Sequence, residues 1–175
     1  MATTHEVRDR LQPTLLDRLT DLDPNSRVES DDSRVMNKSQ IREAVLRDLS
    51  WLLNAVKPMP GIAGAYPVAD DSVLNYGLPP MSGQLASRVD ITLLERAIKH
   101  AIVRFEPRVM EDSLEVKAVE SASVMDSHNV IEFEIRGFMW AQPVPLELLL
   151  RTQVDLEAGQ IQVRDASGGS LKRKG

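Results

Sequence analysis

The spacing of apolar residues changes once along the chain, near Pro107, and this change limits the folds open to it. Before Pro107 apolar residues recur at the 3.6-residue spacing of a helix, and after it they alternate at the two-residue spacing of a strand. Helices followed by strands are typical of domains in which helices pack on an antiparallel sheet. We therefore predict an α+β fold, with N-terminal helices packed on a small antiparallel β-sheet.

Two segments have the pattern of long amphipathic helices. Residues 39–56 carry one apolar stripe, follow Asn37 with Gln40 three residues later, as in a capping box, and end near Pro58. Residues 90–105 repeat the pattern and end before Pro107. The intervening residues 57–83 hold five of the chain's ten prolines, which predicts a long ordered loop without regular structure.

A shorter helix is predicted near the N-terminus, where Leu15, Leu16, Leu19 and Leu22 follow Thr14, a suitable N-cap. Residues 25–38 are polar and are predicted to be a mobile connection. These features divide the chain into an N-terminal segment at 1–38, one α+β domain at 39–165 and a flexible basic tail at 166–175.

Alternation with a period of two predicts the strands. Apolar residues alternate with polar ones at Leu114, Val116 and Ala118, and again at Ile131, Phe133 and Ile135. The alternation shifts around Gly137, which predicts a β-bulge there. Residues 148–156 and 160–164 are predicted to form a final antiparallel pair, joined by a tight turn at 157–159.

Composition excludes several classes of protein. The chain has no cysteine, so a disulfide framework and a thiolate metal site are both impossible, and its three histidines are too scattered to suggest a metal site. No segment approaches the roughly 18 apolar residues of a membrane span, and residues 1–11 lack the apolar centre of a signal peptide. We therefore expect a cytoplasmic protein without a membrane span.

The charge distribution argues against nucleic acid as a partner. The formal net charge is −5, and Lys172, Arg173 and Lys174 lie in the basic tail, so the rest of the chain is more acidic still. An acidic body repels a phosphate backbone. The tail itself has the Gly/Ser composition of a flexible end, and we assign it no function.

Catalytic signals are missing from the sequence. It contains no phosphate-binding G-x-x-x-x-G-K-[ST] run, no G-x-G-x-x-G, no H-E-x-x-H and no G-x-S-x-G. A peptidoglycan hydrolase would need a protonated carboxylic acid, whereas Arg108 beside Glu106 favours the ionised form. Aromatic residues make up only 4% of the chain, which leaves little to stack on sugars. We predict that the chain is not an enzyme and needs no cofactor.

Four motifs, in order along the chain, resemble the TssE family of type VI secretion baseplates. They are "LLDRLTDLDP" at 15–24, "VLRDLSWLLN" at 45–54, "SVLNYGLPPMSG" at 72–83 and "RFEPRV" at 104–109. The stretch "VPLELLLRTQVDLEAGQIQV" at 144–163 also resembles the last two strands of that family. The superfamily includes baseplate wedge proteins of contractile phages and has carried a lysozyme-like label.

The resemblance implies structural work in a contractile injection machine. TssE-like proteins sit in the baseplate wedge with TssF, TssG and TssK, and present strands on which the first ring of sheath subunits assembles. The Glu-Pro-Arg motif of the family falls on Glu106, Pro107 and Arg108 and is implicated in holding the protein within the baseplate. Two alternatives stay open: a regulatory protein-binding adaptor of the same superfamily and, least favoured, a peptidoglycan hydrolase.

The Glu-Pro-Arg motif has two interpretations in terms of its residues. Glu106 ends a helix, where the macrodipole disfavours a carboxylate, so a cation such as Arg108 or Arg104 should compensate it. The pair is then either an internal cap between helix and sheet or a site shared between the fold and a partner. With the resemblance, we favour the shared site.

Two further partner-binding sites are predicted. Tyr76, Gly77, Leu78 and Pro79 form either a docking loop or a rigid turn in which Tyr76 is a half-buried anchor. Gln162 and Val163 lie in the last predicted strand, which must expose an edge unless the sheet closes. A terminal strand of a sheath subunit is the expected guest at that edge, added through main-chain hydrogen bonds.

Overall fold

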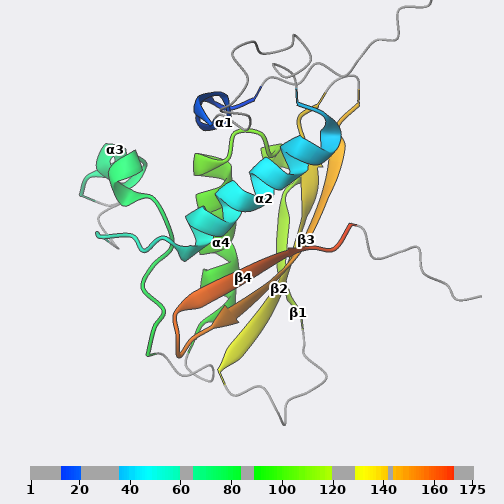
Figure 1. Ribbon diagram of the computed structural model, residues 1–175. Coiled ribbons are helices and arrows are strands. Elements are labelled where there is room, and N and C mark those ends of the chain that lie inside the picture. The colour runs from blue at the N-terminus through cyan, green and yellow to red at the C-terminus, as the bar shows by residue number, and fades with distance from the viewer. Residues whose placement is uncertain are drawn as a thin grey trace, which may run out of the picture.

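Helices cover one face of an antiparallel sheet in the computed structural model of the chain (Figure 1). The structure describes residues 13–20, 36–59, 65–83, 89–119, 129–141 and 144–167. Its helices are α1 (Leu15–Leu19), α2 (Lys38–Asn54), α3 (Pro67–Asp70), η2 (Val73–Asn75), α4 (Ile91–Phe105) and η4 (Glu111–Ser113). Its strands are β1 (Glu115–Val119), β2 (Val130–Met139), β3 (Leu146–Asp155) and β4 (Gln160–Asp165). The predicted α+β class is confirmed.

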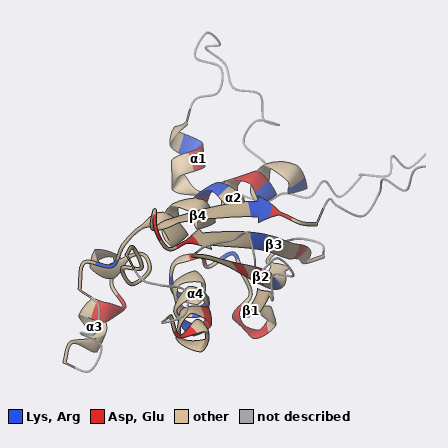
Figure 2. Cartoon of the chain, turned by 90° about the horizontal axis from the view of Figure 1, so that it is seen from below, with Lys and Arg blue, Asp and Glu red and all other residues tan. Residues whose placement is uncertain are grey.

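The sheet has the strand order β1-β2-β3-β4, and every neighbouring pair is antiparallel. This order follows from short connections, since each strand pairs with the next one along the chain. β1 and β4 are therefore the two edge strands. α2 packs against β4 and α4 packs against β1, while the two helices also touch each other (Figure 2).

The core lies between the two long helices and the inner face of the sheet. Fully buried side chains come from α2, α4 and the central strands, among them Leu49, Leu52, Leu53, Ile98, Ile102, Phe133, Ile135, Leu148 and Leu150. Along β2 and β3, buried residues alternate with more exposed ones, as the two-residue period predicts. Burial of such side chains stabilises the fold by about 1.5–3 kcal/mol each.

The predicted helix boundaries agree closely with the structure because the caps are local. Asn37 Oδ1 accepts from the Gln40 N–H, and Gln40 Oε1 accepts from the Asn37 N–H, both at 2.9 Å. Thr14 and Asp17 form the same kind of capping box at the start of α1. The predicted turn at 157–159 is also present, with Gly159 at a φ of 66°.

Two predictions about the strands and loops are wrong. No bulge forms at Gly137, which pairs with Leu148 in an unbroken β2–β3 register. The shift in the pattern arises because Gly137 faces inward, 3.5 Å from the Cα of Leu114 when a Cβ is placed on it, while the apolar Phe138 faces outward. The loop at 57–83 is not wholly irregular, since it contains the short helices α3 and η2.

Some predictions fall on residues outside the described part of the chain. These are Leu22 and most of the predicted connection at 25–38, together with the basic tail beyond residue 167. None of the helices within the described ranges is long and apolar enough to cross a membrane.

Candidate functional site

The Glu106–Arg108 corner lies where α4 ends and the chain turns toward β1. Glu106 is the C-cap of α4: its N–H still donates to the carbonyl of Ile102 at 2.8 Å, but its φ and ψ of −122° and 81° are no longer helical. The following proline disfavours a helical conformation at Glu106 and so ends the helix there. Pro107 is exposed, and Val109 returns to the core, where it pairs with Met139.

Glu106 is buried, with a residue exposure of 3%, and Arg108 neutralises it. Arg108 Nε donates to Glu106 Oε1 at 2.7 Å, Arg108 Nη2 donates to Oε2, and the Arg108 backbone N–H donates to Oε1 at 3.1 Å. Arg108 is thus the compensating cation at this helix terminus. Arg104 is not, because its Nε donates instead to the carbonyl of Asp71 at 2.6 Å.

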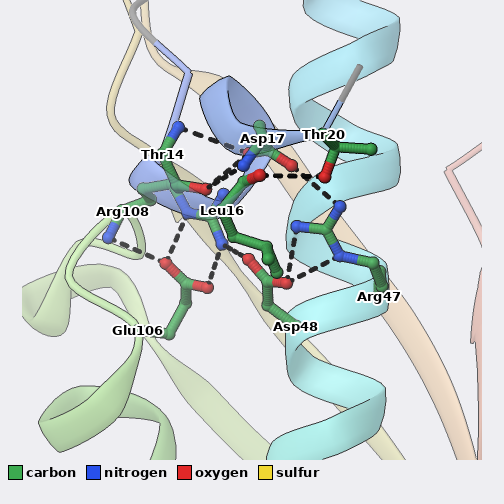
Figure 3. A network of polar contacts seen from close by, with 8 residues as sticks. All are labelled: Thr14, Leu16, Asp17, Thr20, Arg47, Asp48, Glu106 and Arg108. Carbon is green, nitrogen blue, oxygen red and sulfur yellow. Dashed lines mark hydrogen bonds and ion pairs between the residues drawn. The ribbon is translucent and has the colours of Figure 1, made fainter. Parts of the chain in front are cut away.

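A chain of ion pairs extends from this corner to the N-terminal helix (Figure 3). Arg108 Nη2 also reaches Asp48 on α2, Asp48 Oδ1 accepts from Arg47 Nε at 2.9 Å, and Arg47 Nη1 lies 2.8 Å from Asp17 Oδ1 on α1. We call Asp17, Arg47, Asp48, Arg108 and Glu106 the ion-pair chain. It joins three segments that are far apart in the sequence, and it holds three carboxylates but two guanidinium groups.

The electrostatics favour the charged forms of three members of the ion-pair chain, Arg108, Arg47 and Asp17. Burial alone would lower the pKa of Arg108, but the hydrogen bonds and negative charges of Glu106 and Asp48 outweigh it and raise that pKa. The pKa of Arg47 is raised in the same way by Asp17 and Asp48, against its own burial. Burial opposes ionisation of Asp17 too, yet hydrogen bonds from Thr14 and Arg47 leave its pKa lowered.

Tyr76 lies close to the ion-pair chain, as the sequence did not predict. Burial, and then the negative charges of Asp48 and Glu106, raise the pKa of Tyr76. Its ring meets Phe105, the last residue of α4, edge to face with the centroids 5.2 Å apart. The structure therefore brings this half-buried tyrosine and the Glu106–Arg108 corner together.

Gly77, Leu78 and Pro79 lie against the end of α2, where Leu78 and Val56 form an isolated parallel β-bridge. The Leu78 N–H donates to the Ala55 carbonyl and the Lys57 N–H donates to the Leu78 carbonyl, both at 2.8 Å. Leu78 is 1% exposed, Gly77 is buried and Pro79 is half-buried. Of the four residues predicted to bind a partner in this loop, only Tyr76 and Pro79 thus have side chains that are accessible to a partner.

Gln162 and Val163 lie on β4, an edge of the sheet, but α2 occupies part of that edge. Asn54 Oδ1 accepts from the Ile161 N–H at 2.9 Å, and Asn54 Nδ2 donates to the Ile161 carbonyl at 2.8 Å. The N–H and C=O of one residue in an antiparallel strand point to the same side, so those of Ile161 point away from β3. By alternation, the backbone groups of Gln162 point toward β3 and those of Val163 point outward. The edge is therefore occupied by Asn54 at Ile161 and open at Val163 among the described residues.

An exposed apolar surface beside the corner escaped the sequence analysis. Met110, Phe138 and Trp140 have exposed fractions of 40%, 47% and 57%. Backbone hydrogen bonds hold them together, from the Met110 N–H to the Phe138 carbonyl at 2.8 Å and from the Trp140 N–H to the Arg108 carbonyl at 2.7 Å. We call these three residues the Met110–Trp140 surface. The signal that reveals it is the apolar Phe138 on an outward position of β2, followed two residues later by the apolar Trp140 just beyond the end of that strand.

Asp17, Arg47 and Asp48 were also missed as members of the site. Arg47 and Asp48 look like ordinary charged residues beside the apolar stripe of α2, and Asp17 looks like part of a helix cap. Only contacts between distant segments reveal their role. In the ranges the structure describes, no cluster of three histidine, aspartate or glutamate residues is placed to hold a metal ion.

Comparison with known proteins identifies the family. No curated protein and no solved structure is significantly similar to the chain. The model of the family described as "Baseplate wedge protein gp25" matches residues 39–144, more than half of the 175 residues. The match includes α2, the 72–83 motif and the Glu106–Arg108 corner, which also carry the TssE resemblance. The chain therefore belongs to the gp25 family of baseplate wedge proteins, the family whose domain TssE proteins share.

Proposed function

We propose that the chain is a structural wedge component of a type VI secretion baseplate, which acts in the cytoplasm, binds counterparts of TssF, TssG and TssK, and starts the sheath. The observation that carries the proposal is the match to the gp25 family over residues 39–144. The TssE-like motifs at 72–83 and 104–109 favour the type VI system among contractile injection machines.

The wedge partners are proposed to bind at the Glu106–Arg108 corner. Glu106 is buried, so it acts by holding Arg108, whose side chain keeps 21% of its surface exposed. The exposed Pro107 and the Met110–Trp140 surface lie beside it. Tryptophan and arginine are enriched among the residues that dominate binding energy at interfaces. Trp140 fits such a contact, because it is exposed and its backbone N–H donates to the carbonyl of Arg108.

The sheath strand is proposed to add at Val163 on β4. The backbone groups of Val163 point outward, and no hydrogen-bond partner for them exists among the described residues. Main-chain pairing at a sheet edge contributes roughly 0.5–1.5 kcal/mol per hydrogen bond. Strand addition through the few outward backbone groups of β4 is weak by itself, so a ring of wedges that presents the same edge repeatedly would supply the avidity.

We also propose that the chain has no catalytic activity. The carboxylate of Glu106 accepts three hydrogen bonds from Arg108 and is buried, which suits a structural ion pair rather than a general acid. Purified protein should leave a peptidoglycan suspension turbid. Clearance of the suspension that Glu106→Gln abolishes would show a hydrolase instead.

Co-purification tests the wedge role directly. The tagged chain should recover its TssF, TssG and TssK counterparts when they are expressed together. Recovery of a transcriptional or signalling regulator, with none of these proteins, would identify the adaptor of the same superfamily.

A proline substitution tests the role in starting the sheath. Val163→Pro removes an outward N–H while the β3–β4 ladder keeps its bonds, so it should leave the wedge complex intact and block sheath formation. Normal sheaths on wedges that contain Val163→Pro would refute strand addition at this edge.

A further inference from the structure

The side-chain amide of Asn54 occupies the place that a residue of a neighbouring strand would take beside Ile161. A paired strand offers one C=O to the Ile161 N–H and one N–H to the Ile161 C=O. Asn54 supplies both, through Oδ1 at 2.9 Å and Nδ2 at 2.8 Å. Asparagine is suited to this position because its amide carries the same donor and acceptor as a peptide group.

The last turn of α2 fixes this amide in place. The second N–H of Asn54 Nδ2 donates to the Ser50 carbonyl at 2.8 Å, so both donors of the amide are used. At the other end of α2, Arg42 contacts Asp165 with Nη1 at 3.3 Å and donates from Nη2 to the Glu147 carbonyl at 2.8 Å. α2 is thus held at both ends of β4, and the views in Figures 1 and 2 agree in placing it alongside that strand.

At β1, the opposite edge of the sheet, a helix side chain also binds an outward backbone group. The Ala118 N–H of β1 donates to Glu95 Oε1 on α4 at 2.7 Å. Each edge strand therefore gives an outward backbone donor to a side chain of the helix that covers it. Unpaired edge donors and acceptors are templates for pairing with another chain, and proteins commonly protect them.

We infer that Asn54 prevents antiparallel pairing of β4 with the β4 strand of a second copy of this chain, because it occupies the backbone groups of Ile161. A two-fold axis at Val163 would place Val163 opposite its own copy and Ile161 opposite Asp165. No like charges would then face each other directly, because Arg164 would lie opposite Gln162. Asn54 blocks the outer hydrogen bonds at Ile161 in both copies and leaves the central pair at Val163.

This inference concerns the isolated chain and goes beyond the proposed baseplate role, so its test needs no baseplate protein. Asn54→Ala frees the N–H and C=O of Ile161. The variant should self-associate at least about tenfold more tightly than the native chain in sedimentation velocity, because several main-chain hydrogen bonds become available. Asn54→Ala with Val163→Pro should return to the behaviour of the native chain.

Asn37→Ala is the matched control, since it removes a capping asparagine from the other end of α2 and leaves the β4 edge untouched. It should self-associate no more than the native chain. A folded Asn54→Ala that stays monomeric, or an Asn37→Ala that associates equally, would overturn the inference. Persistent association of the double variant would do so too, because pairing would then not use Val163.

If Asn54→Ala does not fold, hydrogen exchange on the native chain still tests whether Asn54 binds the backbone of Ile161. The Ile161 amide should exchange at least about tenfold more slowly than the Val163 amide, since Asn54 protects only the first of them. Equal, fast exchange at both amides would show that the Asn54 contact is not formed in solution, which would refute the inference that Asn54 prevents pairing at this edge.

Discussion

Gly77 shows how a single residue allows two loops to approach closely. Its φ is 115°, and a Cβ at this position would lie 2.2 Å from the carbonyl oxygen of Ala55, a backbone atom that cannot move aside. That approach lets the Leu78 N–H bond the Ala55 carbonyl at the end of α2. The glycine is therefore required by packing as well as by backbone conformation.

Gly77→Ala should lower the free energy of unfolding by at least about 3 kcal/mol, since strain and steric overlap add. Gly83→Ala is the matched control, because Gly83 also has a positive φ, 78°, but no heavy atom of the described residues, its chain neighbours aside, lies within 4 Å of its added Cβ. That control should cost about 1 kcal/mol. Equal losses in urea denaturation would contradict the close approach at Ala55.

Arg108 matters to the fold as well as to the proposed interface. Arg108→Ala should lower the free energy of unfolding by about 3 kcal/mol, because it leaves Glu106 buried with an unpaired charge. Glu106→Gln combined with Arg108→Ala should recover part of this loss, since the uncompensated charge is gone. If the double variant loses as much free energy of unfolding as Glu106→Gln and Arg108→Ala lose in sum, the two charges are not coupled.

At the scale of elements, α1 is held to the body by polar contacts rather than by its apolar residues. Leu15 and Leu19 remain 71% and 74% exposed, while the Asp17 side chain is only 4% exposed and pairs with Arg47. The leucine stripe that predicts an amphipathic helix therefore does not enter the core. The pair contributes modestly, because Arg47 keeps 34% of its side chain exposed and solvent screens the charge at that end.

Asp17→Asn should lower the free energy of unfolding by at most about 1 kcal/mol at neutral pH. The folded-state pKa of Asp17 lies below its ordinary value, so this contribution is present above about pH 4 and is lost as the pH falls through the folded pKa. Urea denaturation from neutral to acidic pH should show the native chain and the variant converging at low pH. A constant difference would mean that the Asp17 charge is not responsible.

The two predicted binding residues of β4 differ in the direction of their backbone groups: those of Gln162 point toward β3 and those of Val163 point outward. Gln162→Pro should cost about 3 kcal/mol or more, because the Gln162 N–H points to β3 and pairs in the ladder. Val163→Pro should cost only about 1 kcal/mol, since its N–H points outward. Thermal melting of the two variants compares them directly, and the reverse order would contradict the alternation set by Asn54.

At the scale of the whole molecule, the proposed binding sites occupy two different places. The Glu106–Arg108 corner lies at the end of α4, and the β4 edge lies under α2. In the proposed function, separate sites would let one subunit bind the wedge through one surface and the sheath through the other. The ion-pair chain connects the corner to α2, so the two sites share one rigid helix.

Both tryptophans of the chain are more than half exposed, and they offer a matched comparison. Trp140→Ala should weaken binding to the purified wedge proteins about 30-fold with little change in melting temperature. Trp51→Ala, on α2 beneath Arg47, should leave binding nearly unchanged. Equal affinities for the two variants in a titration would remove the Met110–Trp140 surface from the interface.

The sequence alone determined the features that depend on neighbouring residues. The change of period near Pro107 predicted the α+β class, Asn37 and Gln40 predicted the start of α2, and Gly159 lies in the predicted turn. These are local features, because helical and strand periods and caps involve residues a few positions apart. The family resemblance likewise rested on short continuous motifs and was confirmed by the gp25 family match.

Tertiary structure decided what depends on contacts between distant segments. The unbroken register at Gly137 depends on how the backbone of Leu114 approaches it, and the partner of Glu106 depends on where Arg104 and Arg108 point after the chain turns. The link from Arg108 to Asp48, and the contact of Asn54 with Ile161, join residues 60 and 107 positions apart. No local period encodes such distances, because side-chain partners are chosen only once the core has brought the segments together.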